Sequence, residues 1–253
     1  MSIFSKRNKE LRKKMSRVSH RSEYLLSDEI SFNVMEAFRN FKASLTVSMP
    51  KKKSGEGTVI VMTSACPEDG KTTVAVNLAV MFALSDAKVV LIDADVRKGR
   101  VSKFFKVHTV PGLSDYLSGQ ETMEAITHEY PENKNLSFIT CGTHSPRPYE
   151  LLESSEMSSM LEELKKQYDY IIIDTPPLMV VSDTLALATQ ADGTVVVTIH
   201  EVSYVNDISK TLEKLRFARA NVLGVVVNDY NVNEKSSYGS SYHYYSYNYK
   251  YGD

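Results

Sequence analysis

The sequence predicts an α/β domain in which a doubly wound, mostly parallel sheet carries helices on both faces. Apolar, β-branched runs typical of buried strands alternate along the chain with segments of helical periodicity, as in a parallel sheet covered on both sides. The 253 residues, 42% of them hydrophobic, suffice for one sizeable core with flanking arms. We therefore expect one folded domain over residues 27–229.

The elements of this domain are expected in the following order. An N-terminal helix covers about residues 27–47, where apolar side chains recur near helical spacing at Phe32, Met35, Phe38 and Leu45. A lysine-rich joint, residues 50–57, follows the helix. Apolar runs then predict strands at 58–63, 88–92, 136–140, 170–173, 194–199 and 222–227. Helices are expected between them, including one that ends near Ala83 and a long one over 202–220.

The N-terminal arm, residues 1–26, is predicted to be basic and flexible. Its first 21 residues carry eight lysines and arginines against Glu10 alone, a net charge of +7 in a chain whose formal net charge is −1. Such an arm fits contact with anionic lipid or an acidic partner, or it is a solvated tail. Nucleic acid is not an expected partner, because no aromatic platform is interleaved with the basic residues.

The composition also argues against several classes of protein. No apolar run reaches the roughly 18 to 20 residues that span a bilayer, and the N-terminus lacks the apolar core of a signal peptide. A cytoplasmic location is therefore expected. Cys66 and Cys141 are too few for a disulfide framework, and the six histidines show no metal-ligand spacing with them. The sequence predicts no metal held by cysteine or histidine.

The loop after the first predicted strand has the features of a phosphate-binding P-loop. Gly70 suits a backbone that closes on phosphate, Lys71 can reach phosphate oxygens, and Thr72 offers a hydroxyl to magnesium at the start of a helix. The common pattern has a further glycine where this chain has Ala65. ATP and Mg²⁺ are the expected cofactors. The residues expected to bind the nucleotide are Ala65, Cys66, Pro67, Glu68, Asp69, Gly70, Lys71, Thr72 and Thr73.

Carboxylates follow two further predicted strands. Asp93 and Asp95 come after the strand at 88–92, and Asp174 comes after the strand at 170–173. Strand C-termini of a parallel sheet gather along one edge, where ligands bind. Magnesium and a transferred phosphoryl group both need oxygen ligands there. A single acid at a strand end is often only a turn former, but two such sites beside a P-loop indicate a catalytic edge.

The C-terminal tail, residues 230–253, is predicted to be flexible. Its tyrosine-rich stretch, residues 238–251, has no apolar periodicity and no aliphatic residue to receive aromatic rings. Its clustered tyrosines are therefore either phosphorylation substrates or adhesive contacts. They are Tyr238, Tyr242, Tyr244, Tyr245, Tyr247, Tyr249 and Tyr251.

Over roughly residues 28–251 these motifs resemble the bacterial tyrosine kinases of the Gram-positive capsule and exopolysaccharide type. The resemblance rests on the P-loop, on the strand ends Asp93-Ala94-Asp95 and Asp174-Thr175-Pro176-Pro177, and on the tyrosine tail. The family is related to the MinD/ParA-like ATPases, which usually carry a lysine early in the P-loop. This chain has Cys66 there, which favours the kinase.

The resemblance implies a role for each matching residue. Lys71 contacts the phosphates, Thr72 ligates magnesium, and Asp93 and Asp174 hold the ion through waters. Asp95 orients or deprotonates the incoming tyrosine hydroxyl.

Two further positions keep two interpretations each. Asn228 matches a position that contacts adenine in related ATPases, or it is a strand-end turn residue. Arg97 faces the phosphates or caps its loop.

The resemblance also implies partners. Glu36, Arg39 and Lys42 match the family's Glu-x-x-Arg-x-x-Arg interface motif, with a lysine that lacks the bidentate fork of the last arginine. This contact closes a homo-oligomeric ring in the unphosphorylated state, and each tail enters the neighbouring active site. Further implied partners are a transmembrane activator (the polysaccharide co-polymerase) and a cognate tyrosine phosphatase. The chain would then lie at the inner face of the membrane and regulate capsule or exopolysaccharide polymerisation and export.

Two functions of other classes remain open at this point. One is a MinD/ParA-like ATPase that switches its own dimerisation and leaves the tail unmodified. The other is a non-enzymatic scaffold that binds nucleotide and docks partners through the tail. Cys66 also suggests a redox switch, because helix N-termini lower the pKa of a thiol. The alternative is that Cys66 is only a small residue packed behind the loop.

Overall fold

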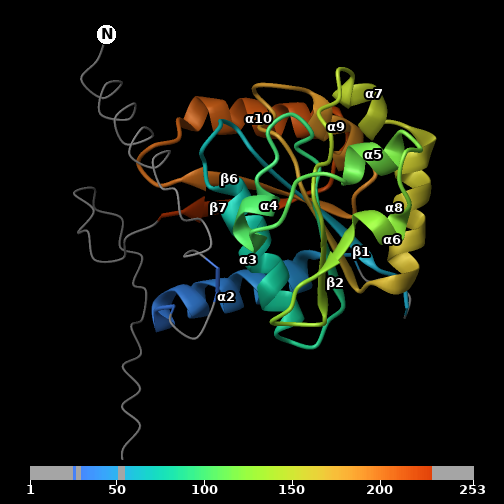
Figure 1. The fold of residues 1–253 in the computed structure, drawn as a ribbon. Coiled ribbons are helices and arrows are strands. Elements are labelled where there is room, and N and C mark those ends of the chain that lie inside the picture. Colours follow the sequence, from blue (N-terminus) through green and yellow to red (C-terminus); the bar gives the residue numbers. More distant parts are fainter. Residues whose placement is uncertain (1–24, 27–29, 51–54, 230–253) are drawn as a thin grey trace, which may run out of the picture.

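The computed structural model describes residues 25–26, 30–50 and 55–229 (Figure 1). The tyrosine tail lies outside the described residues, as does the basic arm except for its last two positions. No helix in the described part of the chain has the length and apolarity needed to cross a lipid bilayer.

The core of the fold is a seven-stranded sheet with the strand order β3-β4-β2-β5-β1-β6-β7. Every neighbouring pair is parallel except β3 and β4, which are antiparallel. The strands are β1 Thr58–Ser64, β2 Val89–Asp93, β3 Thr127–Glu129, β4 Leu136–Ile139, β5 Tyr170–Asp174, β6 Gly193–Ile199 and β7 Val222–Asn228. From β1 the chain moves first toward one edge and later toward the other, which creates the switch point where α/β folds bind ligands.

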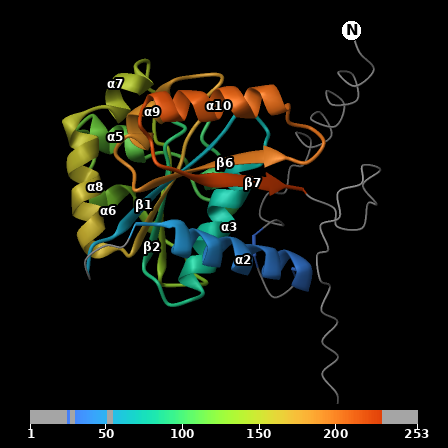
Figure 2. The same ribbon diagram turned by 180° about the vertical axis from the view of Figure 1, so that it is seen from behind.

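Helices cover both faces of the sheet, as Figures 1 and 2 show from opposite sides. Helices α2 and α3 lie on one face, and α8 and α10 lie on the other. The helices are α2 Phe32–Ser48, α3 Lys71–Ala83, α4 Val101–Phe105, α5 Leu113–Leu117, α6 Met123–Ile126, α7 Pro148–Leu152, α8 Ser155–Gln167, α9 Asp183–Ala188 and α10 Val205–Phe217.

The central strands are buried on both faces, which explains their unbroken apolar runs. Along β1, Val59 and Val61 belong to the cluster under α8, whereas Ile60 and Met62 belong to the cluster under α3. Successive strand residues point to opposite faces, so both sets must be apolar when both faces are covered. The predicted doubly wound, mostly parallel sheet is confirmed.

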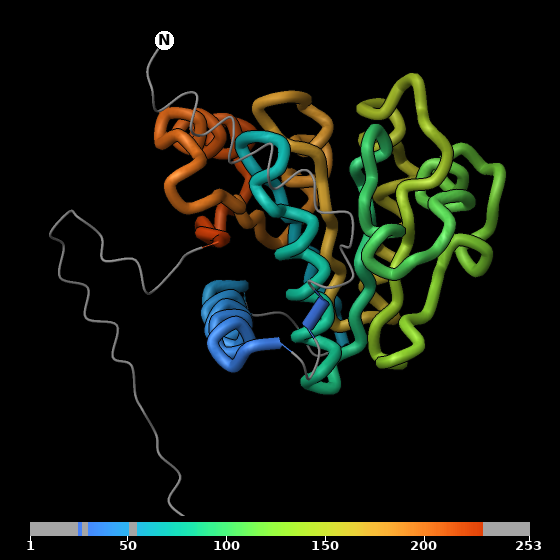
Figure 3. The backbone as a smooth tube through the Cα atoms, turned by 60° about the vertical axis from the view of Figure 1, so that its left-hand side comes forward, coloured from blue at the N-terminus to red at the C-terminus, as the bar shows by residue number. Residues whose placement is uncertain are grey.

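Helix α2 packs against the C-terminal half of α3, away from the P-loop. Figure 3 shows the two helices side by side. Leu45 is buried in the core cluster on that face, and the Lys42 ammonium donates to the Ser85 hydroxyl and lies 5.8 Å from the centre of the Phe82 ring. The opposite face of α2 is open, since Val47 is 87% exposed.

Several element boundaries differ from the sequence-based expectations. Helix α2 begins at Phe32, and residues 30 and 31 precede it, so the predicted start near residue 27 was too early. The last long helix covers Val205–Phe217, not 202–220, because Val202 to Tyr204 form a turn after β6. The edge strand β3 was not expected, because three residues are too short for a recognisable alternation.

Truncating Leu45 to alanine tests the docking of α2. We expect the free energy of unfolding to fall by about 2–4 kcal/mol, because a buried leucine loses its apolar contacts and leaves a cavity. Val47→Ala on the same helix is the matched control, and we expect a change of less than about 0.5 kcal/mol. Urea unfolding of both variants measures the difference. Equal effects would show that α2 is not held by this contact.

Candidate functional site

The sheet register brings three strand ends to one place. Strands β2 and β5 pair directly, and Asp93 is the register partner of Asp174. On the other side of β5, Met62 of β1 is the register partner of Asp174, and the P-loop follows two residues later. The structure therefore brings Asp93, Asp174 and the P-loop together at one sheet edge, as the sequence predicted.

The P-loop enters α3 through Gly70, which has φ +80°. A methyl group on Gly70 would lie 2.0 Å from the side-chain nitrogen of Asn228, at the end of β7. Both the left-handed conformation and this close approach require glycine. Ala65 is buried, but its backbone is not in the left-handed conformation. A side-chain methyl group is therefore tolerated at this position, where the common pattern has glycine.

Asp69 braces the P-loop from inside. Its Oδ2 accepts the backbone N–H of Cys66 at 2.9 Å, and its Oδ1 accepts the Ser203 hydroxyl at 3.0 Å. The Cys66 thiol in turn lies 3.8 Å from Oδ2 of Asp207 on α10. The turn after β6 is therefore tied to the P-loop through Asp69.

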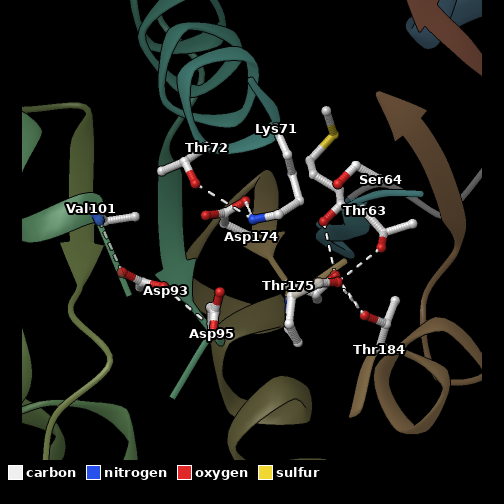
Figure 4. A network of polar contacts seen from close by, with 12 residues as sticks. Thr63, Ser64, Lys71, Thr72, Asp93, Asp95, Val101, Asp174, Thr175 and Thr184 are labelled. Atoms are coloured by element: carbon white, nitrogen blue, oxygen red, sulfur yellow. Dashed lines mark hydrogen bonds and ion pairs between the residues drawn. The ribbon is translucent and has the colours of Figure 1, made fainter. Parts of the chain in front are cut away.

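Lys71 and Asp174 form an ion pair in the centre of the site. The Nζ–Oδ1 distance is 2.5 Å, and both side chains are buried (Figure 4). The Thr72 hydroxyl lies 3.4 Å from the same ammonium. The other oxygen of Asp174, Oδ2, is buried without a hydrogen-bond partner among the described residues.

Asp93 completes a buried acidic pair. Its Oδ2 accepts the backbone N–H of Val101 at 2.9 Å, and its Oδ1 accepts that of Asp95 at 3.3 Å. Burial, and then the nearby charge of Asp174, raises the pKa of Asp93 to about 7. Burial also raises the pKa of Asp174, although the Lys71 ammonium opposes that rise. The carboxyl groups of Asp93 and Asp174 therefore share the single Lys71 ammonium in a site that is buried from solvent.

Threonine hydroxyls fasten the loop after β5 to β1. The Pro176 carbonyl accepts the hydroxyls of Thr63 at 3.1 Å and Thr184 at 2.8 Å. The Thr175 hydroxyl donates to the Met62 carbonyl at 2.9 Å. Figure 4 shows this network beside the Lys71–Asp174 pair, and it gives Asp174 a rigid setting.

Asp95 lies just beyond Asp93, on the loop that joins β2 to α4, and it is half-buried. Its Oδ1 accepts the backbone N–H of Lys98 at 3.0 Å, which closes a tight turn. Arg97 belongs to the same turn. It reaches across to Asp183, the first residue of α9, with Nε–Oδ2 at 2.7 Å.

The three residues of the predicted subunit contact are divided on α2. Glu36 and Arg39 form an exposed ion pair with each other at 2.5 Å. Lys42 instead turns toward α3, as described above. Of the three, Arg39 is exposed, and Glu36 and Lys42 are both half-buried.

The oxygen donors at this sheet edge fit a magnesium ion. Thr72, Asp93 and Asp174 supply a hydroxyl and two carboxylates, which are the oxygen ligands that magnesium prefers. The unpartnered Oδ2 of Asp174 and the excess negative charge favour a cation there. Among the described residues no three Asp, Glu, His or Cys side chains are grouped to hold an ion alone, so such an ion needs phosphate oxygens or water as well.

Some supporting residues were missed from the sequence. Asp69 was named only as part of the nucleotide loop, and Ser203 and Asp183 were not singled out at all. Each acts through a partner that is more than 80 residues away in the chain. Asp183 does stand at a helix start, a common place for an acid, so its sequence position gave no sign of the arginine that it binds.

Together the fold and the site define a P-loop nucleotide-binding protein. Comparison with known proteins agrees: residues 57–223 match the family described as AAA domain. The kinase domain of the Escherichia coli tyrosine kinase ETK superposes with a TM-score of 0.74 at 31% identity, covering 82% of this chain and 80% of that domain. The cell division ATPase MinD of Pyrococcus furiosus superposes less closely, with a TM-score of 0.59 at 25% identity over 70% of this chain and 74% of MinD.

Sequence relatives narrow the class. The chain is 33% identical to the tyrosine-protein kinase YwqD of Bacillus subtilis, over 90% of this chain and 94% of YwqD. It is 35% identical to EpsB of Ralstonia solanacearum over 90% of this chain, but it spans only 30% of the length of EpsB. The chain belongs to the family of bacterial tyrosine-protein kinases.

The raised pKa of Asp93 gives a pH-dependent prediction. The folded state binds this proton more tightly than the unfolded chain, so the contribution of Asp93 to stability falls as pH rises between about pH 4 and pH 7. The full penalty above pH 7 is at most about 4 kcal/mol, at about 1.4 kcal/mol for each pKa unit.

Asp93→Asn removes this penalty. The amide accepts only one of the two backbone N–H groups that Asp93 receives, and this loss is the same at every pH. Without magnesium and nucleotide, we therefore expect the urea midpoint of the variant, relative to the wild type, to be higher at pH 8 than near pH 4. Urea titrations at the two pH values measure the difference. A gain of equal size at both values would mean that the carboxyl is not the group that titrates.

Proposed function

We propose that the chain is an ATP- and Mg²⁺-dependent protein-tyrosine kinase that phosphorylates the tyrosines of its own C-terminal tail. The observation that carries the proposal is the convergence of Lys71, Asp93, Asp95 and Asp174 beside a braced P-loop, in a chain of this family. Phosphoryl transfer needs positioning and neutralised charge more than covalent help, and the site supplies both.

The residues at the base of the site bind the nucleotide. The P-loop N–H groups and the start of α3 hold the phosphates, and the Lys71 ammonium neutralises their charge. Thr72, Asp93 and Asp174 hold magnesium, which when bound neutralises charge on the transferred phosphoryl group. Asn228 lies against Gly70 at the mouth of the loop, a position that fits contact with the base.

Asp95 receives the acceptor. Of the three carboxylates at this edge it is the half-buried one, whereas Asp93 and Asp174 are buried. An acceptor hydroxyl arriving from solvent therefore meets Asp95 first. The Lys98 N–H bond to Oδ1 fixes the carboxylate, which orients the hydroxyl and takes its proton.

The finer arrangement follows from the family resemblance and from the exposed charges of α2. We propose that Glu36 and Arg39 contact a neighbouring subunit and that each tail is phosphorylated in trans. Each added phosphate carries about −1.5 to −2 charges, so repulsion then separates the subunits. We further propose a membrane activator, a cognate tyrosine phosphatase and a role in capsule or exopolysaccharide production.

A MinD/ParA-like ATPase is the second candidate, because the fold superposes on the cell division ATPase MinD with a TM-score of 0.59. Such an ATPase would release phosphate from ATP and leave the tail unmodified. Detection of phosphotyrosine on the purified chain after addition of ATP and Mg²⁺ separates the two functions.

Lys71→Met tests the nucleotide site. We expect phosphotyrosine formation to fall by at least about 100-fold, because the ammonium that neutralises the phosphates is lost. Incorporation of labelled phosphate into the chain measures the rate, and circular dichroism checks folding. Lys166→Met, which removes an exposed ammonium from α8, should keep the wild-type rate. Wild-type incorporation by Lys71→Met would rule out this assignment.

Asp95→Asn separates acceptor chemistry from nucleotide binding. We expect ATP and Mg²⁺ to bind within about twofold of the wild type, while tyrosine phosphorylation falls by about 10²–10⁴-fold, the usual contribution of a general base. Calorimetric titration with ATP and phosphotyrosine blots measure the two quantities. Equal losses of binding and transfer would instead assign Asp95 to the metal.

A further inference from the structure

Asp183 is a buried carboxylate that forms an ion pair with Arg97. Its side chain is 2% exposed, and both of its oxygens face Arg97, with Nε–Oδ2 at 2.7 Å and Nη2–Oδ1 at 3.3 Å. This is the bidentate geometry in which a planar guanidinium fixes both distance and direction. Arg97 itself is 41% exposed, so the contact joins the protein interior to the rim of the site.

The arginine is attached to the turn that carries Asp95. Residues 95–98 form a tight turn. The Lys98 N–H donates to both the carbonyl oxygen and the Oδ1 of Asp95, at 3.1 Å and 3.0 Å. Arg97 occupies the third position of this turn. A turn closed by two hydrogen bonds moves as a unit, so the place of the Arg97 guanidinium and the place of the Asp95 carboxylate are linked.

The aspartate is attached to the segment that carries Asp174. Its neighbour Thr184 donates to the Pro176 carbonyl at 2.8 Å and contacts the Thr175 hydroxyl at 3.1 Å. All of these groups are buried. The start of α9 is therefore fixed relative to Asp174, and through Asp174 to Lys71.

We propose that Arg97 and Asp183 are positioning residues for phosphoryl transfer. Their ion pair bridges the two loops and holds Asp95 at a fixed distance from the Lys71–Asp174 pair, where the acceptor hydroxyl must meet the phosphoryl group. The inference rests on the proposed kinase function. Misplacement by about 1 Å at a reacting centre lowers a rate by about 100-fold, so a rigid bridge matters more for transfer than for nucleotide binding.

A purely structural clamp would behave differently. If the pair only stabilised the fold, its loss would lower thermal stability, ATP affinity and both reactions of the bound nucleotide together. A positioning pair affects the acceptor side alone. Transfer to tyrosine then falls more than transfer to water, because water does not depend on Asp95 being placed for a bulky phenol.

The test uses the full chain with its own tail as acceptor. Asp183→Asn keeps the shape of the side chain and removes the charge, Arg97→Gln removes the guanidinium, and Arg97→Lys keeps the charge without the fork. Glu162→Gln breaks the exposed ion pair with Lys165 on α8 and is the matched control. Phosphotyrosine formation, phosphate release and ATP affinity are measured for each protein.

We expect Asp183→Asn and Arg97→Gln to form phosphotyrosine 10- to 100-fold more slowly, with ATP affinity within twofold of the wild type and phosphate release less affected. Arg97→Lys should be intermediate, and Glu162→Gln should match the wild type. Wild-type phosphotyrosine rates in Arg97→Gln and Arg97→Lys would overturn the inference. A proportional loss of ATP affinity in all three site variants would also overturn it. Absence of phosphotyrosine in the wild type itself would instead refute the proposed kinase function.

Discussion

The ion pair between Lys71 and Asp174 joins the helix that begins at the P-loop to a central strand of the sheet. Both charges are buried, so each depends on the other, because an unpaired charge in this place is far more costly than the pair. Asp93 adds a second carboxylate beside the pair, and burial, followed by the charge of Asp174, raises its pKa. The site is therefore arranged for a further cation and for the phosphates that accompany it.

Such a charge cluster keeps its geometry only if its surroundings are rigid. The P-loop is braced by Asp69 against the turn after β6, and Gly70 lies directly against Asn228. The loop after β5 is fastened to β1 by threonine hydroxyls. These contacts are made within the protein itself, and preorganised groups of this kind are what charge stabilisation in a site requires.

The sequence predicted much of the fold because the central strands are buried on both faces. Their β-branched runs have no other simple explanation, and the acids that follow them mark the strand ends. Short elements were less predictable. Strand β3 has three residues and is recognised only by its pairing with β4. The sequence predicted a helix from residue 202. In the structure residues 202–204 form a turn, and the Ser203 hydroxyl donates to Asp69.

By itself the sequence determined the α/β class, the P-loop and the acids Asp93, Asp95 and Asp174, because these depend on local patterns of apolar and polar residues. Only the tertiary structure decided that Lys71 pairs with Asp174 and that Arg97 turns to Asp183. It also decided that Lys42 contacts Phe82 of α3 while Glu36 and Arg39 pair with each other. The reason is physical. A charged side chain can choose among many partners in a sequence, and the choice follows from which groups the sheet register and helix packing bring within hydrogen-bond distance.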